Sequence, residues 1–193
     1  MSRPKKGLTR QSQWTLILVG GLCFIYVGTQ WNNFFPTENH AGTIGSVLTQ
    51  ANSDILAIPS LNITAPIVYS EGIRESSVQR ELQNGVVHLA ATALPGDSGN
   101  AYIVGHSSNF DNAPGVYNEI FKELTKIRIG DEVDVFRNEQ KFKFVVTETH
   151  IVEPTELWVM SQATEGEKRL SIQTSYPVGT AKQRFIVVSK LLE

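Results

Sequence analysis

Residues 169–190 read RLSIQTSYPVGTAKQRFIVVSK, and this stretch decides how the chain is expected to fold. Two runs rich in β-branched and apolar residues, Arg169–Thr174 and Arg184–Lys190, flank a segment that contains proline and glycine. The pattern predicts two antiparallel strands joined by a short connection. In such a hairpin Ser175 and Arg184 lie near each other, where the two strands meet the connection.

Six more runs of the same character lie between residues 55 and 150. Each is rich in Val, Ile, Phe or Thr and is bounded by a turn cluster. Asn138-Glu139-Gln140 is expected to join the last two as a hairpin. Many short strands with little helix favour a mainly β fold, an eight-stranded closed or nearly closed barrel. The six runs are Ile55–Ile58, Ile63–Val68, Val86–His88, Ala101–Gly105, Glu132–Arg137 and Phe142–His150.

Two segments interrupt this strand pattern with helical spacing. The first is Glu75–Gln83, and the second is Tyr117–Leu124, with apolar residues at Ile120, Phe121 and Leu124. We expect each to form a short helix on the barrel.

The N-terminal part of the chain predicts a membrane anchor. Trp14 to Trp31 is 18 residues without a charge, which meets the lower length limit for a spanning helix. The basic segment 1–13 precedes it, so the N-terminus is expected in the cytoplasm. A cleaved signal peptide is the alternative, although no Ala-x-Ala site follows. Either reading places the polar spacer 32–54 and the domain 55–193 outside the cytoplasmic membrane.

Composition excludes several classes of protein. The 193 residues carry a net charge of −2 and are 41 % hydrophobic, which suits one core and not a basic nucleic-acid binder. Cys23 is the single cysteine, so neither a disulfide framework within the chain nor a cysteine zinc site is possible. The four histidines lack metal-ligand spacing, and no HExxH, GxGxxG or GxxxxGK[ST] string occurs. We therefore expect no metal and no nucleotide cofactor.

Three polar residues stand at the ends of predicted strands. His106 follows the run Ala101–Gly105, Ser175 follows Arg169–Thr174, and Arg184 begins the next run. Chemistry at strand ends on a rigid barrel is a common arrangement. These three residues form the candidate catalytic site.

The same residues carry a resemblance to a known family. Thr174-Ser175-Tyr176-Pro177, then Gly179-Thr180, then the segment from Arg184 to Val188, resembles the active-site hairpin of sortases, where T-C-x-P is followed by R-x-x-V. Gly105-His106-Ser107 is similar to the segment of their catalytic histidine. The resemblance covers about residues 55–192 and adds these matches before the histidine: His88, Thr92, Leu94-Pro95-Gly96 and Gly99-Asn100.

The resemblance implies a sortase-type eight-stranded barrel and a defined reaction. Sortases are membrane-anchored cysteine transpeptidases of bacterial surfaces. A thiolate attacks the Thr–Gly bond of a C-terminal LPxTG-like sorting signal on a surface protein, and an amine of the cell wall or a pilin resolves the thioester. His106 would supply the proton to the leaving amine, and Arg184 would hold the oxyanion or the substrate carbonyl.

One departure from the family changes the expected chemistry. Ser175 stands where sortases carry the cysteine, and a serine hydroxyl is not poised as an anion near neutral pH. Serine needs a close general base that a third group orients. We expect Ser175 to be a poor nucleophile or none. A non-catalytic module that binds sorting peptides and a serine hydrolase using Ser175 and His106 are the two alternatives.

Two further matches have simpler explanations. Gly96-Asp97-Ser98-Gly99 resembles a serine-protease nucleophile string, but Gly, Asp and Ser between two strands are also what a plain turn requires. His88 is expected to pack or to form hydrogen bonds inside the barrel.

Overall fold

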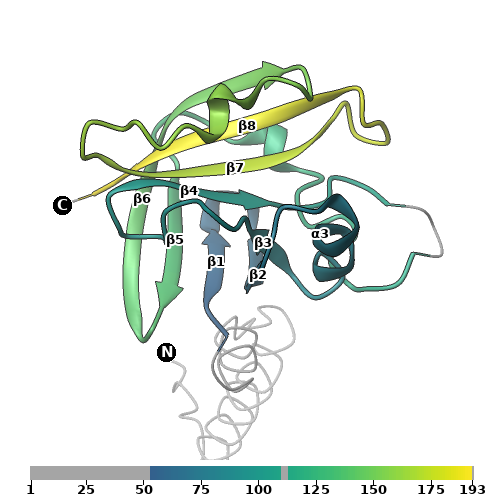
Figure 1. Cartoon of the computed structure of the whole chain (residues 1–193), viewed down its shortest axis with the longest axis horizontal. Coiled ribbons are helices and arrows are strands. Elements are labelled where there is room, and N and C mark those ends of the chain that lie inside the picture. The colour runs from purple at the N-terminus through teal and green to yellow at the C-terminus, as the bar shows by residue number, and fades with distance from the viewer. Residues whose placement is uncertain (1–52, 110–112, 193) are drawn as a thin grey trace, which may run out of the picture. The chain divides into compact units, whose positions relative to one another are not determined.

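The computed structural model describes residues 53–109 and 113–192, which form a closed eight-stranded barrel (Figure 1). Neighbouring strands follow the order β1-β2-β3-β4-β7-β8-β6-β5, and β5 pairs with β1 to close the ring. The mainly β, eight-stranded prediction is therefore confirmed. The strands are β1 (Ile55–Ile58), β2 (Ile63–Tyr69), β3 (Val86–His88), β4 (Gly99–Val104), β5 (Glu132–Arg137), β6 (Gln140–Val152), β7 (Lys168–Tyr176) and β8 (Gln183–Leu191).

Every strand places alternate side chains inside the barrel. This is the two-residue period of extended backbone, and it explains why the strands could be recognised in the sequence. Large interior side chains such as Leu56, Phe144 and Ile172 are fully buried. Burying each of them contributes about 1.5–3 kcal/mol relative to leaving it exposed.

A second apolar cluster covers part of the outer face. It joins Val87, Tyr102 and Ile186 to Leu82, just after helix α3 (Glu75–Glu81), and to Val159 of the 3₁₀ helix η3 (Leu157–Met160). Along each strand these residues alternate with the ones that point into the barrel, so they lie on its outer face. Strands β3, β4 and β8 are thus buried on both faces along part of their length.

The β5–β6 hairpin turns where the sequence predicts it, but with two residues rather than three. Asn138 and Glu139 have φ of 49° and 64°, and Gln140 already pairs with Arg137. Two consecutive positive φ values are typical of the tight hairpin turns whose twist matches the flanking strands.

The segment Tyr117–Leu124 is not the helix that its spacing predicts. It forms successive turns that end in the 3₁₀ helix η2 (Leu124–Lys126). The N–H of Phe121 donates to the carbonyl of His106 at 2.9 Å instead of to Tyr117 four residues back. Burial of the Phe121 ring and its backbone bond to His106, just after β4, outweigh the helical preference of residues 117–124.

The other helices differ less from expectation. Helix α3 ends at Glu81, two residues before the predicted Gln83, because the last turn tightens to bonds between residues three apart. The short 3₁₀ helices η1 (Pro59–Leu61) and η3 were not predicted. Among the described residues no helix is long and apolar enough to cross a bilayer. The predicted anchor, residues 14–31, lies outside them.

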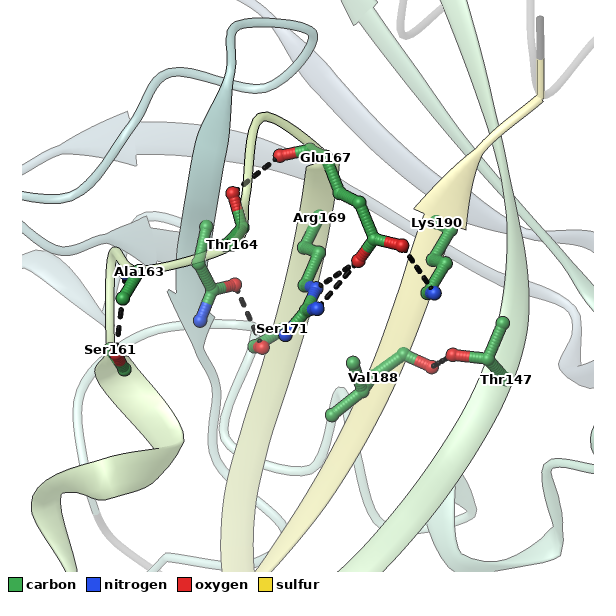
Figure 2. Close-up of polar contacts among 10 residues, drawn as sticks. Thr147, Ser161, Ala163, Thr164, Glu167, Arg169, Ser171, Val188 and Lys190 are labelled. Carbon is green, nitrogen blue, oxygen red and sulfur yellow. Dashed lines mark hydrogen bonds and ion pairs between the residues drawn. The ribbon is translucent and has the colours of Figure 1, made fainter.

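Polar contacts fasten β7 to its neighbours at the end away from the β7–β8 turn (Figure 2). Glu167 accepts hydrogen bonds from Arg169 at 2.5 and 2.7 Å and from Lys190 at 2.6 Å. Arg169 and Lys190 are opposite each other in the β7–β8 register, so Glu167 relieves their like-charge repulsion. Deeper along β7, Ser171 donates to Asn100 of β4 at 2.9 Å.

Candidate active site

The pairing of three strands brings the predicted site residues into one row. In the parallel β4–β7 pair Val104 is opposite Gln173, and the N–H of Gly105 continues the ladder to the Gln173 carbonyl at 3.0 Å. His106 and Ser175 each lie two residues beyond the last pair of this register, Val104 and Gln173. In the antiparallel β7–β8 pair Ser175 is directly opposite Arg184, as the hairpin predicted. Residues paired across strands share a face of the sheet.

That row lies on the outer face of the barrel. Val104 and Ile186, two residues from His106 and Arg184 on the same strands, belong to the outer apolar cluster. The site is thus at the carboxyl ends of β4 and β7 and the start of β8. Strand β7 runs to Tyr176, so Ser175 lies within it rather than just after it.

His106 is half-buried, and burial lowers the pKa of its imidazole below the ordinary value of 6.5. Its ring is therefore neutral at pH 7. The amide nitrogen of Asn109 lies 3.5 Å from Nε2 of this ring.

Ser175 is half-buried and makes no side-chain hydrogen bond to another described residue. In particular, no bond joins its Oγ to His106, and no carboxylate among the described residues bonds to the imidazole. A serine nucleophile is activated by just such a chain of base and orienting group. Within residues 53–109 and 113–192, no such chain of groups reaches the Ser175 hydroxyl.

The Arg184 side chain bonds to backbone carbonyl groups of the β7–β8 turn. Nη1 donates to the carbonyls of Ala181 and Gln183, both at 3.0 Å. These two bonds use part of a guanidinium that has five N–H donors. Its positive charge is available on the face that Ser175 occupies.

Two hydrogen bonds join the segment around His106 to the β7–β8 hairpin. The N–H of Gly179 donates to Ser108 Oγ at 3.0 Å, and Thr174 Oγ1 donates to the carbonyl of Gly105 at 2.9 Å. These contacts hold His106 and Ser175 in a common frame. Ser108 was not singled out from the sequence, and Thr174 entered only as part of the hairpin motif, because only the register of strands far apart in the chain brings them to these partners.

His88 does not join this row. Its ring is buried at the end of β3, lies 2.8 Å by Nε2 from the carbonyl of Ala93 and stands 5.2 Å from the ring of Tyr69. The prediction that His88 packs and forms hydrogen bonds is confirmed. The segment 96–99 is a turn with φ of 98° at Gly96 and 120° at Gly99, as its composition predicts.

The residues that the structure describes offer no metal centre, since no three His, Cys, Asp or Glu side chains cluster among them. A cavity of about 350 Å³ lies beside α3, lined by Glu71, Gly72, Ser77, Arg80, Glu81 and Asn84. None of the three site residues lines it.

Comparison with known proteins identifies the family of the barrel domain. The sortase domain family matches residues 56–192, which is nearly the whole barrel and contains His106, Ser175 and Arg184. The chain belongs to the sortase family. Sortase A of Bacillus anthracis is 23 % identical over 137 residues, a match covering 71 % of this chain and 58 % of that sortase. The chain thus matches little more than half of this relative's length.

Solved sortases share the barrel. Sortase C-1 from Actinomyces oris is 25 % identical, with a TM-score of 0.61 over 72 % of this chain and 71 % of that one. A sortase D5 transpeptidase of Clostridium perfringens is 24 % identical, with a TM-score of 0.60 over 81 % of this chain and 91 % of that one, a likeness of fold. The expected sortase-type barrel is therefore confirmed.

Proposed function

We propose that this sortase-family chain binds the C-terminal sorting signal of surface proteins across the row His106–Ser175–Arg184. The observation that supports the proposal is the pairing of Ser175 with Arg184 across β7 and β8, with His106 two residues beyond the end of the neighbouring strand β4. The signal is an LPxTG-like peptide. Its acyl group is destined for an amine of a cell-wall precursor or a pilin lysine.

In a cysteine-bearing sortase the thiolate adds to the Thr–Gly carbonyl and the peptide bond breaks to give a thioester. The leaving amine takes a proton from the imidazolium, and the incoming amine later releases the acyl group and restores the thiolate. In this chain His106 occupies the position of the proton donor. Arg184 is placed to bind the carbonyl oxygen as negative charge develops on it.

Ser175 limits this chain to binding, with acyl transfer impaired. Its hydroxyl has no base within a hydrogen bond among the described residues, and His106 is oriented by an amide rather than a carboxylate. The same observation favours the binding-module alternative over the serine hydrolase. A serine hydrolase needs a Ser–His bond and an orienting acid, and the described residues supply neither at this site.

The proposed location is the outer side of the cell membrane. Residues 14–31 would anchor the chain as a single span, with residues 1–13 in the cytoplasm and the barrel outside. This places the site next to surface proteins and to the amines that accept them.

The experiment is incubation of the full chain with a fluorescent LPxTG-like peptide, followed by affinity measurement and intact mass. The proposal predicts saturable binding without a covalent adduct on Ser175. A scrambled peptide of the same composition is the control. An adduct at Ser175 would instead establish the serine hydrolase, and equal affinity for the scrambled peptide would overturn the proposed substrate.

A further inference from the structure

Tyr102 is a buried tyrosine whose hydroxyl is used beside the active site. It lies in the middle of β4 on the outer face, is 0 % exposed, and donates from its hydroxyl to Gln173 Oε1 of β7 at 2.9 Å. Burial raises its pKa, an effect that the nearby charge of Arg184 only partly opposes. The hydroxyl therefore keeps its proton and remains a donor at all working pH values.

This bond orients the Gln173 amide. A primary amide has one oxygen and one nitrogen at its end, so turning Oε1 toward Tyr102 turns Nε2 away from it. The residues opposite Gln173 on both neighbouring strands, Val104 and Ile186, are apolar and buried. Nε2 bonds to no other described residue and is not among the buried unpaired atoms, so it is at least partly accessible to solvent and to a bound peptide.

Gln173 and Ser175 are spaced to contact one extended peptide. They lie two residues apart on the same strand and the same face, which separates them by roughly 6.5–7 Å. In an extended peptide, carbonyl groups that point the same way repeat at that spacing. A peptide whose reacting carbonyl lies at Ser175 and whose backbone follows β7 therefore presents a second carbonyl at Gln173.

We propose that Gln173, oriented by Tyr102, is a positioning residue that donates a hydrogen bond to a backbone carbonyl of the bound peptide, two residues from the reacting carbonyl. This inference rests on the proposed function of the row His106–Ser175–Arg184. Gln173 takes part in no covalent step. It sets the register of the peptide and so selects which bond lies at Ser175.

Two variants separate the donor from its orienting partner. Gln173→Glu keeps an acceptor for Tyr102 but removes both N–H donors, and it should weaken peptide binding roughly threefold to tenfold. Tyr102→Phe keeps the donors but frees the amide to rotate, so a smaller loss is expected. Gln79→Glu, on the exposed side of α3, makes the same chemical change away from the site and should leave the affinity unchanged.

A peptide scan identifies the carbonyl that Gln173 contacts. Each backbone amide is replaced in turn by an ester, whose carbonyl is a weaker acceptor. For the wild-type full chain, one ester two residues from the reacting bond should weaken binding. For Gln173→Glu the same ester should cause no further loss, since the bond is already absent.

Turnover gives an independent readout in a Ser175→Cys background. Gln173→Glu should raise KM and leave kcat nearly unchanged, because the bond is made equally in the ground state and in the transition state. Unchanged affinity of Gln173→Glu, or an equal loss for every ester peptide in both proteins, would overturn the inference while wild-type binding upholds the proposed function. Absence of peptide binding to the wild-type chain would overturn both.

Discussion

At the scale of single residues, the chemistry of the site depends on one atom, the Oγ of Ser175. A cysteine with a pKa near 8.5 carries a few per cent thiolate at pH 7, whereas a serine hydroxyl carries no usable anion without a base. His106 does not bond to this hydroxyl, and burial keeps its ring neutral. Under the proposed function, Arg184 still binds a substrate carbonyl, and only the attacking atom is altered.

Arg184→Ala should weaken binding of the sorting peptide by tenfold or more. A charge-assisted hydrogen bond contributes roughly 1.5–3 kcal/mol, which is a factor of about ten to one hundred in Kd. Fluorescence anisotropy with a labelled peptide measures the change. Lys182→Ala removes the same charge from an exposed position in the same turn and is the control. Equal affinities of the wild type and Arg184→Ala would show that Arg184 does not contact the bound peptide.

The pH dependence of a Ser175→Cys variant should reveal the low pKa of His106. The reactive form pairs a thiolate with an imidazolium, so activity falls on the acid side as the thiolate–imidazolium pair gains a further proton. Since burial lowers the His106 pKa, that acid limb should lie below pH 6.5, and the alkaline limb near the thiol pKa.

Because the reactive form needs a proton on a ring whose pKa burial lowers, that form is a minor species, which predicts slow turnover. A profile of kcat/KM against pH, with the His106 ring titrated in parallel by NMR, makes the measurement. An acid limb above pH 6.5 would contradict the assignment.

At the scale of elements, the segment that carries His106 is held by a close contact between β4 and the turns that follow. A Cβ on Gly105 would come within 2.3 Å of the buried Phe121 ring, while Phe121 also binds the carbonyl of His106. The lack of a side chain at Gly105 therefore lets the Phe121 turn pack directly beneath the candidate histidine.

Gly105→Ala should destabilise the protein by about 1–3 kcal/mol, the usual cost of overpacking a filled site, and should displace His106. Denaturant unfolding measures the first effect, and the NMR shifts of the His106 ring report the second. Gly72→Ala is the matched control, since nothing lies within 4 Å of its added Cβ and its φ is ordinary. Equal stability of Gly105→Ala and the wild type would show that the Phe121 contact is not tight.

Elements with a two-residue period could be predicted from the sequence, while features set by tertiary contacts could not. The hairpin carrying Ser175 and Arg184 is local, so its alternating residues and turn were enough to place the two side by side. The turns around Phe121 depend on a bond to His106, and the Tyr102–Gln173 pair joins residues 71 positions apart. Local spacing carries no information on either contact.

At the scale of the whole molecule, the domain and the N-terminal segment make separate contributions to the proposed role. The barrel is closed, so no sheet edge is left along the ring and the site rests on a rigid frame. The basic and apolar N-terminal residues predict on which side of the membrane the barrel lies. A surface role requires both.

A reporter that is active only outside the cytoplasm, fused after Glu193, should be active in cells. The four basic residues before the uncharged span, Arg3, Lys5, Lys6 and Arg10, orient the span with its N-terminus inside. A cytoplasm-specific reporter at the same position is the control and should be silent. The reverse pattern would contradict the proposed location.

The most direct test of the account is to replace the oxygen of Ser175 by sulfur. Ser175→Cys in the full chain should form a thioester with an LPxTG-like peptide and transfer its acyl group to an added amine, both detected by intact mass. His106→Ala in that background should abolish the gain, because no other histidine lies in the row. A folded Ser175→Cys protein that binds the peptide but forms neither adduct nor product would contradict the claim that the row is an acyl-transfer site lacking only its nucleophile.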